Sequence, residues 1–229
     1  PFRVNDALEI LEKSNIPVIA ITGRPAGWSE NFALTWPITC IVAENGAVAL
    51  WAENKKPKKA WAQDHVTRAV NKQRLEFVSQ LIKKQFPHAT LAQDSAGRET
   101  DIAIDHSEFS KLSPSEIESI AQLMRHHGLT ATVSSIHING WIGNHNKWTG
   151  ACWAADLLIN SQLENTKDQW VFIGDSSNDA CMFEQISNSF GVANIIDFLP
   201  KLVHQPRYIT PSPRGAGFAE MTTSLLSIR

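Results

Sequence analysis

The sequence lacks an excess of charge of either sign. Its 21 lysine and arginine residues are matched by 23 aspartate and glutamate residues, which gives a formal net charge of -2 at pH 7. Proteins that bind nucleic acid without sequence preference use a concentrated basic face to contact phosphates. The charge balance therefore argues against nucleic acid as a partner.

Cysteines and long apolar runs are also scarce. The three cysteines, Cys40, Cys152 and Cys181, are far apart and follow none of the paired spacings of a zinc site or a disulfide framework. No apolar run reaches the roughly 18 to 20 residues that cross a bilayer, and the first residues lack the charged-then-apolar layout of a signal peptide. We therefore expect a protein of the reducing cytoplasm, without a membrane partner.

The first and last parts of the chain share one pattern, in which apolar runs of strand length alternate with helical periodicity. Such runs stand at 17–22, 39–43, 170–174 and 190–194, and a further helix is expected at 196–203. Apolar strands that alternate with helices are typical of a parallel sheet buried on both faces. Residues 1–60 and 144–229 are therefore predicted to form one Rossmann-like α/β core.

Residues 61–143 have a different pattern. A long polar helix is predicted over 62–86 and a second helix over 114–127, and each is followed by two strand candidates, at 89–93 and 100–105 and at 129–134 and 136–141. Ile102 and Ile104 alternate with polar residues, as in a sheet with one wet face. The order helix, strand, strand, repeated once, predicts an inserted α+β domain.

The segment GDSSND, residues 174–179, follows a predicted buried strand at the point where a helix begins. Ligands of open α/β sheets bind at this edge, beyond the carboxyl ends of the strands. Magnesium prefers hard oxygen ligands and keeps several waters, so one or two carboxylates are enough. Asp175, with Asp179 or Asn178, is therefore a candidate metal site. The alternative interpretation is a capped helix start.

Two other segments could serve a phosphate group. In ITGR, Thr22 stands at the end of a strand, Gly23 lets the backbone approach a ligand, and Arg24 could pair with a carboxylate or a phosphate. The pattern is not the GxxxxGK[ST] of a P-loop, and it could be only a strand-to-helix turn. Lys147, just before a predicted helix, could place a positive charge beside a phosphoryl group, although most lysines are solvated surface residues.

Along the chain, ITGR comes first, Lys147 second and GDSSND third, with the αββαββ insertion between ITGR and Lys147. This arrangement resembles the haloacid dehalogenase (HAD) superfamily, and the resemblance covers essentially the whole chain. The similarity is to the large-cap subclass that includes sucrose-phosphate and mannosyl-phosphoglycerate phosphatases. The resemblance implies that Thr22 binds the phosphoryl group, Lys147 neutralises it, and Asp175 ligates magnesium. Asn178 and Asp179 would complete the acidic loop. The implied cofactor is Mg²⁺, and the implied ligand is a small phosphorylated metabolite such as a sugar phosphate.

The same resemblance points to residues that would contact the substrate. The run ENG, which contains Asn45, is similar to the family's loop near the site, although it could be a simple turn. Further candidates are polar residues on the wet face of the cap sheet, namely Arg98, Asp101, Ser135, His137 and Asn139. Arg98 could bind an anionic part of the substrate or pair with Glu99 or Asp101. Trp28 and Trp141 could stack on a sugar or belong to the core.

One family feature is not found in the sequence. Members begin with a strand ending in DxD, whose first aspartate attacks phosphorus and whose second is a general acid and base. We expect the native gene to encode roughly 20 to 45 further residues upstream, the usual length of a strand and its connection. The predicted activity is a magnesium-dependent phosphatase with an aspartyl-phosphate intermediate, and the given chain alone is expected to be inactive. The alternatives are a catalytically inactive phosphometabolite-binding protein and a phosphomutase.

Overall fold

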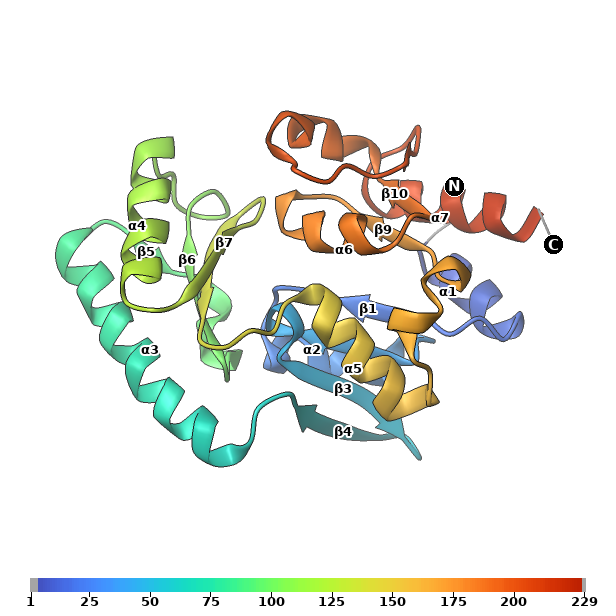
Figure 1. Ribbon diagram of the computed structural model, residues 1–229, viewed down its shortest axis with the longest axis horizontal. Helices are drawn as coiled ribbons and strands as arrows, with labels where there is room; N and C mark the ends of the chain where they lie inside the picture. The colour runs from blue at the N-terminus through green and yellow to red at the C-terminus, as the bar shows by residue number, and fades with distance from the viewer. Residues whose placement is uncertain (1–3, 228–229) are drawn as a thin grey trace.

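The computed structural model describes residues 4–227. The chain forms a core and a cap, which lie side by side, with the cap on the left in Figure 1. The first core sheet has the order β1-β2-β3-β4, with β1 (Ile19–Ile21), β2 (Cys40–Ala43), β3 (Val48–Glu53) and β4 (Lys56–Trp61). The second has the order β11-β10-β9, with β9 (Phe172–Gly174), β10 (Ser189–Gly191) and β11 (Tyr208–Ile209). β1 pairs in parallel with β2, and the second sheet is parallel throughout, which confirms the predicted α/β core.

The antiparallel hairpin of β3 and β4 is a difference from the prediction, which assigned no strand to residues 48–61. Asn54 and Lys55 form its turn with φ values of 51° and 60°, the left-handed geometry that suits a two-residue hairpin loop. Lysines and Pro57 obscure β4 in the sequence because it is an edge strand, where such residues are common. The core sheet therefore ends at Trp61, and the chain enters the cap after it.

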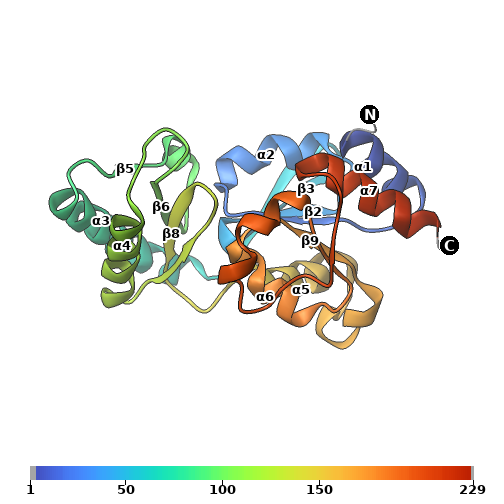
Figure 2. The ribbon, with the colours of Figure 1, turned by 90° about the horizontal axis from the view of Figure 1, so that it is seen from above.

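Helices cover the core on two sides. Figure 2 shows α1 (Val4–Lys13), α2 (Ala26–Thr35) and α7 (Arg214–Ser227) on one side of the strands, and α5 (Lys147–Ile159) and α6 (Ala180–Gln185) on the other. α1 contacts α7, so the two ends of the described chain lie close together. Within residues 4–227, none of the helices is both long enough and apolar enough to cross a membrane.

Short 3₁₀ turns connect these elements. They span Glu44–Gly46, Gln93–Gly97, Leu163–Asn165, Lys167–Gln169, Ser177–Asp179, Ala193–Asp197 and Leu199–Lys201. The predicted helix at 196–203 is therefore wrong, because this part of the chain forms two 3₁₀ turns instead. Pro200 has no backbone N–H and disfavours a continuous helix there.

The cap is a four-stranded antiparallel sheet covered by two helices. Its order is β5-β6-β8-β7, with β5 (Thr90–Leu91), β6 (Asp101–Asp105), β7 (Thr130–Val133), β8 (His137–Trp141), α3 (His65–Gln85) and α4 (Pro114–His126). The expected αββαββ order is thus present. Ser113 and Glu116 form the capping box that begins α4. Ile104 and Ile138 pack with both helices in the cap's own hydrophobic core.

The opposite face of the cap sheet is buried as well. His137 and Asn139 are 3% and 1% exposed, because this face of β8 lies over the turn between β1 and α2. The expectation that these side chains stand on a wet face is therefore wrong. They belong to the boundary between cap and core.

Candidate functional site

Hydrogen bonds within the turn after β1, and from this turn to residues 42 and 45, fix its conformation. The Thr22 N–H donates to Val42 O at 2.9 Å, and the Arg24 N–H donates to Thr22 Oγ1 at 3.0 Å. The carbonyl oxygen of Thr22 accepts from the Asn45 N–H at 3.0 Å. Thr22 Oγ1 is an acceptor in this turn, so its own hydrogen can be donated to a ligand oxygen.

Lys147 lies at the other side of the core and is buried. Asn146 caps α5 by accepting from the Thr149 N–H, which makes Lys147 the first residue of the helix. Its ammonium group contacts Asp179 Oδ1 at 2.6 Å and Asn178 Oδ1 at 3.2 Å. These contacts hold the ammonium group in place at the carboxyl end of β9.

Asp179 organises the loop that follows β9. Its second oxygen, Oδ2, accepts from the backbone N–H groups of Asp175 at 2.9 Å and Ser176 at 3.1 Å. A β-carbon on Gly174 would lie 2.6 Å from this oxygen, so only glycine allows the close approach. Both carboxylate oxygens of Asp179 are thus engaged within the protein.

Asp175 is the better placed of the two aspartates to receive a metal ion. Burial raises the pKa of its carboxyl group, and repulsion from Asp179 adds to the rise, while Lys147 opposes it. A divalent cation would relieve both effects. The described residues hold no group of three or more histidine, cysteine, aspartate or glutamate side chains that could bind a metal. Magnesium at Asp175 would therefore take most of its ligands from water and phosphate, as it commonly does.

A cavity of about 630 Å³ separates the two core sheets. Its walls include β1 from Ile19 to Ile21 and β9 with the residues before it, and Lys147 and Asp175 also line it. β1 and β9 are edge strands of their respective sheets, so their backbone edges border this mostly apolar space. Thr22 directly follows β1. Of the three residues predicted to bind phosphate and metal, Lys147 and Asp175 thus line one cavity, and Thr22 follows the last residue of β1 that lines it.

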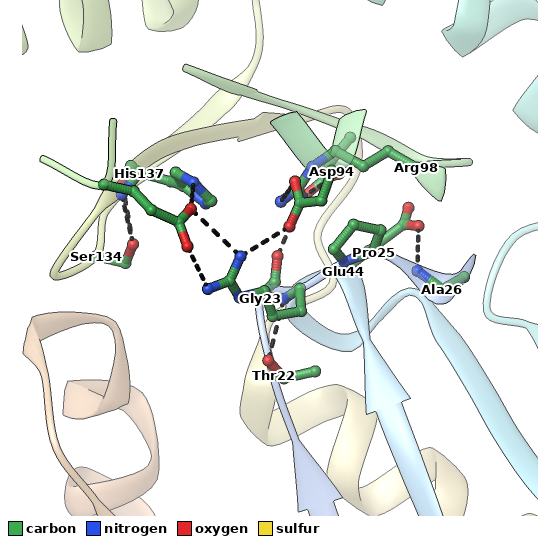
Figure 3. A network of polar contacts seen from close by, with 12 residues as sticks. Thr22, Gly23, Pro25, Ala26, Glu44, Asp94, Arg98, Ser134 and His137 are labelled. Carbon is green, nitrogen blue, oxygen red and sulfur yellow. Dashed lines mark hydrogen bonds and ion pairs between the residues drawn. The ribbon is translucent and has the colours of Figure 1, made fainter. Parts of the chain in front are cut away.

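The cap contacts the turn after β1 through a network of charged groups (Figure 3). The Arg24 guanidinium pairs with Asp94 at 3.0 Å and with Glu108 at 2.9 Å. The other carboxylate oxygen of Glu108 contacts His137 Nε2 at 2.9 Å. Burial lowers the pKa of His137, and the charge of Arg98 lowers it further. Because a carboxylate can only accept, the hydrogen bond between the two side chains requires His137 to donate its Nε2–H to Glu108.

Arg98 joins the cap to the same turn, and it is fully enclosed. It donates to the Gly23 carbonyl oxygen at 3.0 Å and to both oxygens of Asp101, at 2.8 and 2.9 Å, with a further contact to Asp94. Burial raises the pKa of Asp101 to about 7 against the opposing effect of Arg98. Of the two roles considered for Arg98, the structure thus shows the pairing with Asp101.

Two buried amides meet at Gly23. A β-carbon there would lie 3.0 Å from Asn45 Oδ1 and 3.4 Å from Asn139 Nδ2. Asn45 Nδ2 and Asn139 Oδ1 have no hydrogen-bond partner among the described residues, which is unusual for buried polar atoms. Ser135 is exposed at the tip of the β7–β8 hairpin, where Ser134 makes the hydrogen bonds to His137 instead.

Sequence reasoning missed Asp94, in the 3₁₀ turn Gln93–Gly97, and Glu108, in the loop after β6, because neither belongs to a motif. A partial signal was available for Glu108, since it follows the strand-ending Asp105, a position at which an aspartate often binds the next backbone N–H groups. It also missed the role of Glu44, whose carboxylate accepts from the backbone of Ala26 in the core and Thr100 in the cap. Of the two tryptophans considered for sugar stacking, Trp28 is 41% exposed and Trp141 is buried.

The fold is that of the haloacid dehalogenase-like hydrolases. The chain is similar to a protein of Thermoplasma acidophilum, with 15% identity over 97% of this chain and 88% of that one and a TM-score of 0.71. It is also similar to a HAD/COF-like hydrolase from Plasmodium vivax (17%, 99% and 88%, TM-score 0.68). A third is the sucrose-phosphatase from Synechocystis, solved with sucrose and phosphate (15%, 96% and 91%, TM-score 0.67). No family model and no curated protein matches the chain.

Proposed function

We propose that this protein is a magnesium-dependent phosphatase that hydrolyses a small phosphorylated metabolite, with a sugar phosphate as the first candidate. The observation that carries the proposal is that Lys147 and Asp175 line the cavity between the two core sheets, while Thr22 directly follows the cavity-lining strand β1. The similarity in fold to a sucrose-phosphatase that was solved with phosphate supports this reading.

Each of the three residues has a distinct role in the proposal. Thr22 Oγ1 donates to a phosphoryl oxygen, and the Lys147 ammonium group, fixed by Asp179, neutralises charge on the phosphoryl group. Asp175 holds Mg²⁺, which when bound supplies further positive charge to the phosphoryl oxygens. These groups bind and orient the phosphate, but none of them is a suitable attacking carboxylate, since Asp175 is assigned to the metal.

The nucleophile is proposed to lie on a strand that fills the cavity between β1 and β9. A strand there would pair with both exposed backbone edges, and an aspartate at its carboxyl end would lie beside Thr22 and Asp175. We propose that this strand comes from outside the described residues 4–227. The volume and the apolar lining of the cavity support the assignment.

The reaction then proceeds in two displacements. The aspartate oxygen attacks phosphorus, the bond from phosphorus to the ester oxygen breaks, and the leaving alcohol takes a proton from a second carboxylic acid. The resulting carboxylate removes a proton from water, which attacks the aspartyl-phosphate. Inorganic phosphate leaves and the nucleophile is regenerated.

Asp175→Ala in the full-length protein tests the proposal. Release of phosphate from p-nitrophenyl phosphate in the presence of Mg²⁺ should fall by at least about a hundredfold, as when a main electrostatic contact of the transition state is lost. Asp156→Ala, an exposed position on α5, is the matched control and should keep its activity. Retention of most activity by Asp175→Ala would refute the metal assignment. Phosphate binding without turnover in the unsubstituted protein would favour the binding-protein alternative.

A further inference from the structure

Glu108 is the cap carboxylate that lies over the turn after β1. Arg24 donates to Oε1 at 2.9 Å and to Oε2 at 3.4 Å, and His137 contacts Oε2 at 2.9 Å, so the group is fixed from two sides. Its side chain is nevertheless 24% exposed and can be reached by a ligand. We infer that Glu108 determines which leaving group the site accepts, namely one that carries hydroxyl groups and no negative charge. This inference rests on the proposed phosphatase function.

The loop that carries Glu108 is rigid. The buried carboxylate of Asp105 accepts hydrogen bonds from four successive backbone N–H groups, those of Ser107, Glu108, Phe109 and Ser110, at 2.8 to 3.1 Å. The Ser110 hydroxyl also donates to the Asp105 carbonyl oxygen at 2.7 Å. A carboxylate on such a loop keeps one position relative to the core, which is what discrimination between leaving groups requires.

The charges around Glu108 disfavour an anionic leaving group. Two guanidinium groups, Arg24 and Arg98, are paired with three carboxylates, Asp94, Asp101 and Glu108. A carboxylate on the substrate would therefore meet Asp94 and Glu108 while both guanidinium groups are already occupied. Placing like charges together at such a boundary is costly.

The same groups suit hydroxyls. The Glu108 carboxylate accepts three hydrogen bonds, and a carboxylate has about four lone-pair sites, so one is left to accept an O–H group. The ring of Trp28 lies 5.6 Å from the Arg24 guanidinium and is exposed, so a sugar ring could rest on it.

Glu108→Gln in the full-length protein tests the inference with three probes: glucose 6-phosphate, 3-phosphoglycerate and p-nitrophenyl phosphate. The unsubstituted enzyme should prefer glucose 6-phosphate to 3-phosphoglycerate by at least about a hundredfold in kcat/KM. Glu108→Gln keeps the side-chain shape and removes the charge, so it should raise kcat/KM for 3-phosphoglycerate. The ratio of kcat/KM for glucose 6-phosphate to that for 3-phosphoglycerate should fall at least about tenfold. A gain of activity cannot result from poor folding. Glu118→Gln, an exposed glutamate on α4, is the matched control.

The possible outcomes distinguish a failure of the Glu108 inference from a failure of the proposed phosphatase function. An active enzyme whose preference is unchanged by Glu108→Gln, or one that prefers 3-phosphoglycerate from the start, would overturn the inference and leave the phosphatase assignment standing. A narrowed preference in the Glu118→Gln control would also overturn it, because the effect would then be general to cap charge. Absence of phosphate release from all three probes would overturn the proposed function and this inference together.

Discussion

Arg98 links one buried carboxylate in the cap to the backbone of the core. Its side chain is 2% exposed and that of Asp101 is fully buried, so each charge depends on the other for compensation. Arg98→Ala should lower the free energy of unfolding by about 3–5 kcal/mol, because it leaves Asp101 buried without a partner. Urea unfolding of the full-length protein measures this.

Arg125→Ala provides the matched comparison for this prediction. Arg125 pairs with Glu118 at 3.1 Å on the surface of the cap, where both side chains are about half exposed. Loss of such a pair should cost at most about 1 kcal/mol. Equal destabilisation by the two substitutions would show that burial of the Arg98 pair does not matter.

Single residues differ in how far the sequence could predict them. Lys147 and Asp175 stand at element ends, where chain topology alone brings them to one edge of the core, and their neighbourhood could be anticipated. The pairing of Asp179 with Lys147 and with two backbone N–H groups could not be anticipated. It depends on the close approach of the Asp179 carboxylate to Gly174, which a side chain at position 174 would prevent. The role of each residue in binding phosphate or metal stays a prediction.

At the scale of elements, the turn Glu44–Gly46 couples the core to the cap. The buried Glu44 carboxylate accepts from the N–H of Ala26, the first residue of α2, at 2.9 Å. It also accepts from Glu99 N–H at 3.0 Å, and from the N–H and hydroxyl of Thr100 at 2.6 Å each. One carboxylate therefore satisfies backbone donors of both parts.

Glu44→Gln should loosen this connection. The amide replaces one acceptor oxygen by a donor that faces other donors, at a cost of about 1–3 kcal/mol for the unsatisfied groups. Hydrogen exchange of the backbone at Glu99 and Thr100 should become faster than in the unsubstituted protein. Glu53→Gln, at an exposed pair with Lys58, should leave it unchanged. Unaltered exchange in Glu44→Gln would mean that other contacts hold the cap in place.

Most elements could be predicted from the sequence because their signals are local. The α4 helix has a capping box, and Ile138 of β8 stands between the polar residues His137 and Asn139. The wrong helix at 196–203 has a local cause in Pro200, whereas another failure has a tertiary cause. The wet-face interpretation of His137 failed because alternation shows which residues share a face of a sheet, but not whether another domain covers that face.

For the whole molecule, the defining feature is a core in two sheets with a cavity between their facing edges. The order of motifs predicted an α/β core with an inserted α+β domain, and the fold agrees with that, although the core strands form two sheets. The central claim is that phosphate and magnesium bind at the end of this cavity, beside a strand that carries the nucleophile.

A crystal structure of the full-length protein with Mg²⁺ and phosphate tests that claim most directly. The account predicts a strand paired with both β1 and β9, phosphate contacted by Thr22 and Lys147, and Mg²⁺ ligated by Asp175. Phosphate bound elsewhere, or β1 paired directly with β9, would contradict it.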